Sequence, residues 1–329
     1  MPTGAVPLRQ FAPHDVDELT DTAHKILAES GSSAGRPELL RRVATAAARL
    51  DETILHICRP VDTDDGLYVL RGLPVDDAGI GPTPSGWDTA GDRAAAWDVL
   101  LLLLAAAMGH PIAWEGQQEG RFVHNIVPSP GHEQEQTGAS STVLLSPHTE
   151  DAFHPGRAHL LLLACMRNHD AVATTAASIR KVRLSADDLA LLSRPVLPIL
   201  PDDAYAEARS FAGAPPKVPA LWQTEAGPTL RYDPAYTPLD EAPADYRAAY
   251  ERLTAELERV SVAVALEPGD VLVVDNDLVV HGRVPFKARY DGTDRWLKRA
   301  SVRVPGRRSR PLSEADEHGY GQAALVAHI

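Results

Sequence analysis

Apolar residues in the first third of the chain recur at helical spacing. They fall three and four residues apart over His14–Glu29 and Arg36–Leu50, a pattern typical of amphipathic helices that bury one face. Residues 30–35, rich in glycine and serine, predict a loop between the two helices. The nearly continuous apolar run in Asp92–Met108 predicts a largely buried helix, and Gly66–Gly72 predicts a strand.

Beyond Pro111 the pattern changes to short apolar runs separated by turn residues. One amphipathic helix interrupts them at Tyr246–Val260, and the segment 198–243, rich in proline, alanine and aspartate, is expected to form a lid. Short strands without alternating helices favour a sandwich or a barrel over a parallel sheet. The predicted strands are Phe122–Val127, Thr142–Leu145, His159–Met166, Val271–Asp275, Leu278–Arg283 and Arg295–Val304.

Composition and charge narrow the classes of protein that this chain can be. Its 329 residues include 45 acidic and 32 basic residues, and the net charge of −13 argues against non-specific nucleic-acid binding and against binding to anionic membranes. The longest apolar stretch, Val99–Met108, is too short for a bilayer span, which needs about twenty residues. Two cysteines are too few for a disulfide framework, and Met1–Gln10 does not resemble a signal peptide. We therefore expect a cytoplasmic protein.

The first residues that carry candidate chemistry are His148 and Glu150. In an extended segment, residues two apart point to the same side, so this imidazole and this carboxylate would project together. His281 ends a strongly apolar strand and would supply a third ligand, and two histidines with one carboxylate form the facial triad of non-haem Fe(II) oxygenases. By itself the pair is weak evidence, because random placement of the 13 histidines and 45 acidic residues would give about two pairs of a histidine and an acid two positions apart.

Two arginines follow His281 on the last predicted strand. Arg295 and Arg299 would share one face of that strand, and Trp296 and Lys298 would face the other side. A buried guanidinium needs an anionic partner, because an unpaired buried charge is very costly. The partners could be structural carboxylates or the carboxylates of small molecules beside the metal, and we favour small molecules.

Four motifs resemble the clavaminate synthase-like iron(II)/2-oxoglutarate oxygenases. Within that family the chain is most similar to the members that hydroxylate free amino acids such as arginine, enduracididine and asparagine. The resemblance extends from about Leu67 to Val304. The motifs are segments 148–150, 269–276, 281–286 and 291–299, which read HTE, GDVLVVDN, HGRVPF and DGTDRWLKR.

The resemblance implies a mainly β core with flanking helices, an α+β arrangement, in which the strands form a double-stranded β-helix, or jelly-roll barrel. We expect one oxygenase domain over residues 1–329. Its mainly helical part, residues 1–110, would pack on a jelly-roll core of residues 111–305. The core would carry the lid at about residues 198–243, and residues 306–329 would form a C-terminal tail.

The resemblance also implies roles for individual residues. The ligands of Fe(II) would be His148, Glu150 and His281. The cosubstrate 2-oxoglutarate would bind Arg295 and Thr174, although the register of the strand also allows Thr175. The substrate amino acid would meet Arg299 at its carboxylate, Glu150 with Ser141 or Ser140 at its ammonium, Gln117 near its backbone and Asp233 at its side chain.

Several of these positions also have a plainer interpretation. Thr174 could be an ordinary strand residue, and Gln117 and Ser141 could be solvated loop residues. Asp202 and Asp203 stand where the family has an acidic lid residue, but we interpret them as a solvated turn.

The implied function is that of an Fe(II)- and 2-oxoglutarate-dependent dioxygenase that uses O2 to hydroxylate Cβ or Cγ of a free L-amino acid in antibiotic or other natural-product biosynthesis. A single acid at Asp233 favours a basic or ureido side chain, such as that of arginine, lysine, citrulline or enduracididine. Ala235 stands where the arginine hydroxylases carry a second acid, which makes arginine a less favoured substrate than the others in that group. A desaturase or cyclising oxygenase of the same family is an alternative. Outside enzymes, the alternative is a non-catalytic barrel that binds a small acid.

Overall fold

Two β-sheets form the centre of the protein in the computed structural model, which describes residues 6–30, 37–60, 62–205, 211 and 213–327. The larger sheet has eight strands in the order β1 (Leu8–Gln10), β2 (Leu67–Arg71), β11 (Val271–Asp275), β6 (Leu160–Arg167), β13 (Trp296–Arg303), β3 (His110–Trp114) and β14 (Ala324–Val326), with β4 (His124–Ile126) also paired to β13. The smaller sheet has the order β10 (Val262–Val264), β7 (Thr174–Ser178), β12 (Val279–Arg283) and β5 (Leu145–His148). A separate hairpin joins β8 (Leu221–Thr224) to β9 (Gly227–Leu230).

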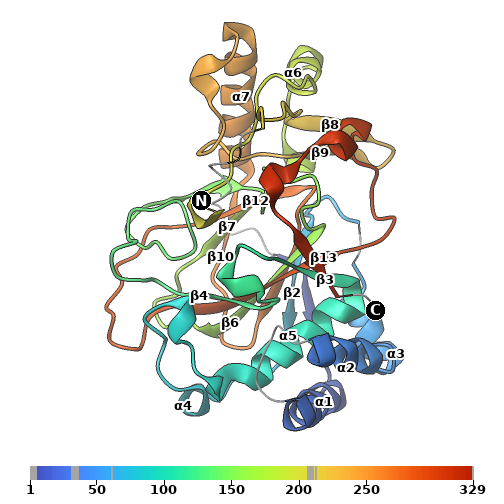
Figure 1. Ribbon diagram of the computed structural model, residues 1–329, viewed down its shortest axis with the longest axis vertical. Helices are drawn as coiled ribbons and strands as arrows, with labels where there is room; N and C mark the ends of the chain where they lie inside the picture. Colours follow the sequence, from blue (N-terminus) through green and yellow to red (C-terminus); the bar gives the residue numbers. More distant parts are fainter. Residues whose placement is uncertain (1–5, 31–36, 61, 206–210, 212, 328–329) are drawn as a thin grey trace.

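Helices gather at the two ends of the molecule (Figure 1). One group comprises α1 (Pro13–Ser30), α2 (Pro37–Ala47), α3 (Glu52–Cys58) and α5 (Ala95–Met108), and α6 (Ala186–Leu192) and α7 (Ala244–Val260) lie at the opposite end. The short α4 (Asp77–Ile80) precedes α5. Proline begins both α1 and α2, a position where its missing N–H leaves no helical hydrogen bond unmade. Within the described ranges, no helix is both long and apolar enough to cross a membrane.

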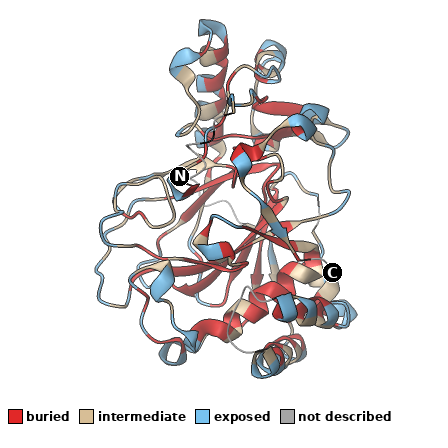
Figure 2. Cartoon of the chain, viewed as in Figure 1, coloured by how far each residue is buried: buried red, intermediate tan, exposed pale blue. Residues whose placement is uncertain are grey.

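The central strands β6 and β11 of the larger sheet are buried on both faces, which explains why they read as continuous apolar runs, whereas the edge strands β1 and β14 are partly exposed (Figure 2). On β6, Leu160 and Leu162 pack with the helices α1, α2 and α5. The alternate residues Leu161 and Leu163 pack in a second core that contains residues of the smaller sheet and of α7. Two of the histidines in the site described below, His148 and His281, come from the paired strands β5 and β12 of the smaller sheet.

Most predicted elements are confirmed, with boundaries shifted by a few residues. The predicted helices at residues 14–29, 92–108 and 246–260 correspond to α1, α5 and α7, while the one at 36–50 ends at Ala47 and is followed by α3. The strand predicted at Thr142–Leu145 is wrong, because β5 begins at Leu145 and β12 pairs with Leu145–His148. No element had been predicted for β3, β7, α6 or β14. The predicted loop lies, from residue 31 onward, outside the described residues.

The predicted fold class of a mainly β core with flanking helices is confirmed. The described strands pair into two open sheets and do not close into a barrel. Apart from the parallel pair β1–β2, the strand pairs are antiparallel. The C-terminal segment is integrated into the fold, because β14 adds a strand beside β3.

Candidate active site

The predicted ligand triad comes together at the end of β5. His148 is the last residue of β5 and lies opposite His281 of β12 in the strand register. The Nε2 atoms of His148 and His281 lie 3.9 Å and 3.3 Å from Oε2 of Glu150. One ligand atom from each residue lies within 4.8 Å of the others, so the three can bind a single metal ion. Glu150 itself lies beyond the strand, in a turn, and not on an extended segment as the sequence argument assumed.

Hydrogen bonds and charge prepare these side chains to act as ligands. His148 donates from Nδ1 to the carbonyl of Ser146 at 2.8 Å, which leaves the lone pair of Nε2 facing Glu150. Burial and the neighbouring His281 lower the pKa of His148, which favours the neutral imidazole that binds metals. Burial alone would raise the pKa of Glu150, but Arg299 and the two histidines hold it well below its usual range.

Arg295 and Thr174 lie next to each other beside the triad. Nη2 of Arg295 donates to Oγ1 of Thr174 at 3.0 Å, and both residues line the same cavity as the three ligands. Among the described residues, no carboxylate forms an ion pair with Arg295, and its Nε has no hydrogen-bond partner. Burial lowers the pKa of Arg295 to about 10, so the site stabilises a guanidinium less than water does. An anionic ligand would supply the missing partner.

Arg299 has two partners within the protein, neither of which the sequence predicts. Its Nη1 forms an ion pair with Oε1 of Glu150, and its Nη2 lies 2.8 Å from Nδ1 of His124. Burial and the nearby Arg299 lower the pKa of His124 to about 3, so the ring is neutral and accepts this hydrogen bond. His124 lies on β4, directly opposite Arg299 of β13. A histidine on a three-residue strand offers no spacing signal that could have revealed this contact.

Acidic side chains occupy another side of the site. Asp151 accepts hydrogen bonds from Nε1 of Trp114 and from the Tyr205 hydroxyl, both at 2.6 Å. Burial, with Glu150 beside it, raises the pKa of Asp151 to about 6. Burial, together with Asp151 and Glu150, also raises the pKa of Asp202 to about 7, and Asp202 lines the cavity. Asp202 is half-buried and its neighbour Asp203 is exposed, and both lie in the cavity wall.

The cavity has a volume of about 690 Å³, within the range of small-molecule sites. The predicted site residues in its wall are Gln117, His148, Glu150, Thr174, His281, Arg295 and Arg299. Asp233 and Ser141 are both buried but are not part of that wall. Asp233 accepts the Ala235 N–H at Oδ1, 3.1 Å away, and burial raises its pKa to about 7 despite the nearby His148.

Comparison with known proteins identifies the family. A model described as "Taurine catabolism dioxygenase TauD, TfdA family" matches residues 63–301, which include all three residues of the triad. The chain belongs to the TauD/TfdA family. The family match also contains the whole smaller sheet and the central strands β6 and β11 of the larger sheet.

Relatives of this TauD/TfdA-family chain include amino acid hydroxylases. The enduracididine beta-hydroxylase of Streptomyces hygroscopicus is 37% identical over 297 residues, which cover 83% of this chain and 84% of the relative. The L-ornithine/L-arginine 3-hydroxylase of Catenulispora acidiphila is 32% identical over 314 residues, which cover 85% of this chain and 90% of the relative.

Solved structures of the non-heme iron oxygenase OrfP are similar over nearly the whole chain. The complex of OrfP with Fe, succinate and (3R,4R)-dihydroxy-L-Arg has a TM-score of 0.82 at 37% identity, and covers 90% of this chain and 94% of OrfP. The complex with Fe and alpha-ketoglutaric acid has a TM-score of 0.79 at 38% identity, with the same two coverages.

The side chains of this TauD/TfdA-family chain fit a metal ion and a carboxylate ligand by their own chemistry. Oε2 of Glu150 is buried without a hydrogen-bond partner, between two imidazole nitrogens, which is the environment that a cation would satisfy. Arg295 is a buried cation without an acidic partner in the described structure, which is the environment that a carboxylate would satisfy.

Proposed function

We propose that this protein is an Fe(II)- and 2-oxoglutarate-dependent hydroxylase of a free L-amino acid. The observation that carries the proposal is that His148, Glu150 and His281 converge in one cavity with the unpaired Arg295. A metal ligand set with open positions and a nearby anion site are what an iron enzyme with a dicarboxylate cosubstrate requires. The relatives named above support the same reaction and a free amino acid as substrate.

The residues of this chain would hold the two small molecules in fixed positions. Arg295 would grip the distal carboxylate of 2-oxoglutarate through two parallel hydrogen bonds, with Thr174 as a further donor. Arg299, oriented by His124, would bind the carboxylate of the amino acid. Glu150 would meet its ammonium group, for which Ser141 also stays a prediction, and Gln117 would lie near its backbone. The iron and its cosubstrate would supply the oxygen chemistry, while the protein selects one C–H bond, at Cβ or Cγ.

The acidic side of the cavity supports a basic or ureido side chain as the substrate class. Asp202 in the cavity wall and Asp233 near His148 both have raised pKa values, so a bound cation would stabilise their charged forms. Because the enduracididine and the ornithine/arginine hydroxylases act on basic amino acids, we infer a substrate of that class, in natural-product biosynthesis.

The proposal also covers the jelly-roll fold, the domain organisation and the cellular location of the protein. We infer that the two sheets correspond to the jelly-roll of the family and that residues 1–329 form one oxygenase domain. We also infer that residues 198–243 act as the lid, since residues 202–205 lie in the cavity wall. A cytoplasmic location agrees with the cosubstrate, which is a cytoplasmic metabolite.

An assay of product formation would test the proposed function. The protein is incubated with Fe(II), ascorbate, 2-oxoglutarate, air and a panel of free amino acids that includes lysine, ornithine, arginine, citrulline and asparagine. We expect succinate and a product 16 mass units heavier from at least one basic or ureido amino acid, and neither from a Glu150→Ala control. A product two mass units lighter would identify a desaturase instead. Binding of an amino acid without any turnover would favour the non-catalytic barrel.

A further inference from the structure

Glu150 has an unusual position for a ligand of a metal site. It follows β5, which ends at His148, so no strand pairing of β5 fixes its backbone. The next residue, Asp151, has a φ of 52°, so the chain turns sharply there. The orientation of the Glu150 carboxylate relative to the two histidines must therefore depend on other contacts.

Arg299 contacts the carboxylate itself, and the contacts that hold the Glu150 backbone come from the side chain of Asn276. Its Oδ1 accepts the Glu150 N–H at 2.7 Å, and its Nδ2 donates to the Glu150 carbonyl at 3.0 Å and to the Ala158 carbonyl at 3.1 Å. Asn276 is fully buried, with an exposed fraction of 0%. One amide group thus bonds to both the N–H and the carbonyl of Glu150, and links them to the segment that leads into β6.

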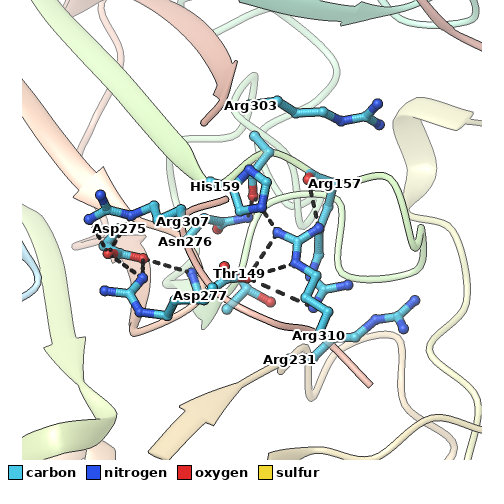
Figure 3. Close-up of polar contacts among 12 residues, drawn as sticks. Thr149, Arg157, His159, Arg231, Asp275, Asn276, Asp277, Arg303, Arg307 and Arg310 are labelled. Atoms are coloured by element: carbon cyan, nitrogen blue, oxygen red, sulfur yellow. Dashed lines mark hydrogen bonds and ion pairs between the residues drawn. The ribbon is translucent and has the colours of Figure 1, made fainter. Parts of the chain in front are cut away.

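The turn that carries Asn276 is itself held by the C-terminal segment (Figure 3). The Asn276 N–H donates to the carbonyl of His159 at 2.9 Å. On one side of Asn276, Asp275 accepts hydrogen bonds from Arg307, the shortest at 2.6 Å. On the other side, Oδ1 of Asp277 accepts two from Arg310, at 3.2 Å and 2.9 Å. The Asn276 amide therefore cannot follow a movement of Glu150 without breaking buried ion pairs.

We propose that Asn276 is the positioning residue of the metal centre, which holds the Glu150 backbone so that its carboxylate faces His148 and His281. This inference rests on the proposed function, since it assumes that the triad binds a divalent metal. It assigns to Asn276 a role in metal affinity that is separate from its contribution to the stability of the fold. Partners of metal ligands that lie outside the ligand set commonly change metal affinity by about 10- to 100-fold when they are removed.

Asn168 provides a matched control. It is buried, and its side chain makes the same pattern of bonds: Oδ1 accepts the Val172 N–H at 2.9 Å, and Nδ2 donates to the carbonyls of Val172 at 3.2 Å and Leu266 at 3.0 Å. None of these groups belongs to the triad. Replacing either asparagine by alanine removes one hydrogen bond to a backbone N–H and two to backbone carbonyls, so both variants should lose comparable thermal stability.

The experiment is a titration of the metal-free protein with cobalt(II), followed by the visible absorption of the bound ion, with thermal unfolding measured on the same samples. We expect Asn276→Ala to raise the Kd for cobalt by about 10- to 100-fold and Asn168→Ala to leave it within about threefold of the wild type. Equal cobalt affinities in the two variants would overturn the positioning role. If the wild-type protein binds no cobalt at the triad, the proposed function falls together with this inference.

A second pair of variants keeps the test decisive if Asn276→Ala does not fold. Aspartate retains the acceptor for the backbone N–H and removes only the two donors, so Asn276→Asp and Asn168→Asp are milder changes. The added negative charge by itself would strengthen cation binding. A fall of tenfold or more in the cobalt affinity of Asn276→Asp alone would therefore support the role of the amide, and an unchanged or higher affinity would overturn it.

Discussion

At the scale of single residues, Arg295 and Arg299 differ in the side chains that they contact, and this difference determines which of them is better suited to bind a ligand. Arg299 already has an acidic partner in Glu150 and a neutral acceptor in His124. Arg295 contacts a hydroxyl and, within the described chain, has no acid to pair with. The unpaired guanidinium is the stronger candidate for a site that binds a free carboxylate, because such a ligand removes an unfavourable buried charge.

The first prediction concerns Arg295→Lys. An ammonium cannot reproduce two parallel hydrogen bonds to one carboxylate, and the loss of one such bond to a charged group costs about 1.5–3 kcal/mol. We expect the KM for 2-oxoglutarate to rise roughly tenfold to a hundredfold, with a much smaller change in the KM for the amino acid. The control is Arg283→Lys, since Arg283 also lines the cavity but bonds to Ser140 and Val143. Equal effects on both KM values would indicate that Arg295 has a structural role and does not bind 2-oxoglutarate.

The second prediction concerns recognition of the side chain by Asp233. Removing one partner of a buried charge pair costs about 2–5 kcal/mol, so Asp233→Ala should lower kcat/KM for a basic amino acid roughly 30-fold to several thousand-fold. Decarboxylation of 2-oxoglutarate without hydroxylation should persist, because the triad is unchanged, and succinate formation measures it. Full activity of Asp233→Ala on the preferred substrate would indicate a neutral side chain.

The third prediction concerns acid stability and His159. Burial and three nearby arginines lower the pKa of His159 to about 4, and its Nδ1 accepts the Val304 N–H at 3.1 Å. Because the unfolded chain binds a proton at this residue near pH 6.5 and the folded chain does not, the contribution of His159 to the free energy of unfolding falls as the pH decreases from 6.5 to 4. His159→Gln keeps an acceptor and removes the titration, so its stability should depend less on pH, by roughly 1–3 kcal/mol over that range.

Denaturant unfolding between pH 4 and 7 measures this difference. The buried acids Asp202 and Asp233 have raised pKa values and act in the opposite direction, but they are present in both proteins and cancel in the comparison. A His169→Gln variant, which alters an exposed histidine, is the control and should follow the wild type. Parallel pH profiles of wild type and His159→Gln would contradict the prediction.

At the scale of elements, one face of β13 contributes to the candidate active site and the other face contributes to the stability of the fold. Arg295 and Arg299 point into the cavity, while Lys298 on the alternate face is 1% exposed and forms an ion pair with Asp98 of α5. Lys298 also donates to Oδ1 of Asn125 at 3.2 Å. The predicted division of the strand into two faces is confirmed by these contacts.

The fourth prediction follows from this pair. Lys298→Met leaves the buried Asp98 without its cation, and breaking a buried pair in this way costs about 3–5 kcal/mol. Adding Asp98→Asn removes the uncompensated charge, so the double variant should recover much of the lost stability in denaturant unfolding. The KM for 2-oxoglutarate should stay near the wild-type value in both variants. A double variant as unstable as the single one would show that charge is not the cause.

The elements that the sequence predicted differ physically from those that it did not. The strands β6 and β11 are buried on both faces, and the helix α5 is mostly buried. Each therefore has a long apolar run, which is visible in any single sequence. The strand β7 reads Thr-Thr-Ala-Ala-Ser, with small and weakly apolar side chains, and exists because β10 and β12 pair with it on either side. The strand β14 has three residues and depends on β3 in the same way.

The same distinction applies to the site. The triad and the two arginines could be predicted because each is a residue type with a specific chemistry at a spacing that the strands define. The contacts of His124, Asp151 and Asn276 could not, because each depends on segments that meet only in the folded protein. Nor does the sequence show that Asp202 lies in the cavity wall.

At the scale of the whole molecule, the charge of the chain suits a cationic substrate. The net charge is −13, and the cavity wall includes Glu115, Glu119, Glu135, Asp202 and Asp203. A negative field around a cavity raises the local concentration of cations and their rate of association. The arginines that would bind carboxylates lie deeper, at the buried end near the triad.

The fifth prediction tests this field through salt. The Debye length shortens from about 30 Å at 0.01 M to about 8 Å at 0.15 M, so long-range attraction of a cation is screened. We expect kcat/KM for a cationic substrate such as lysine to fall roughly three- to tenfold over that range. A neutral amino acid such as citrulline is the control and should change by less than about twofold. Equal salt dependence of both would argue against electrostatic steering.

The contact between Asn276 and Glu150 has a consequence for how the protein folds. It joins residues 126 positions apart, and the arginines that hold its turn come from still later in the chain, at residues 307–310. Contacts of such large sequence separation are slow to form, because the intervening chain must lose its freedom before they stabilise anything. We therefore expect the carboxylate ligand to be held in its place only once Asn276 and residues 307–310 have folded against the rest of the chain. A nascent chain that still lacks these residues would offer iron no complete site.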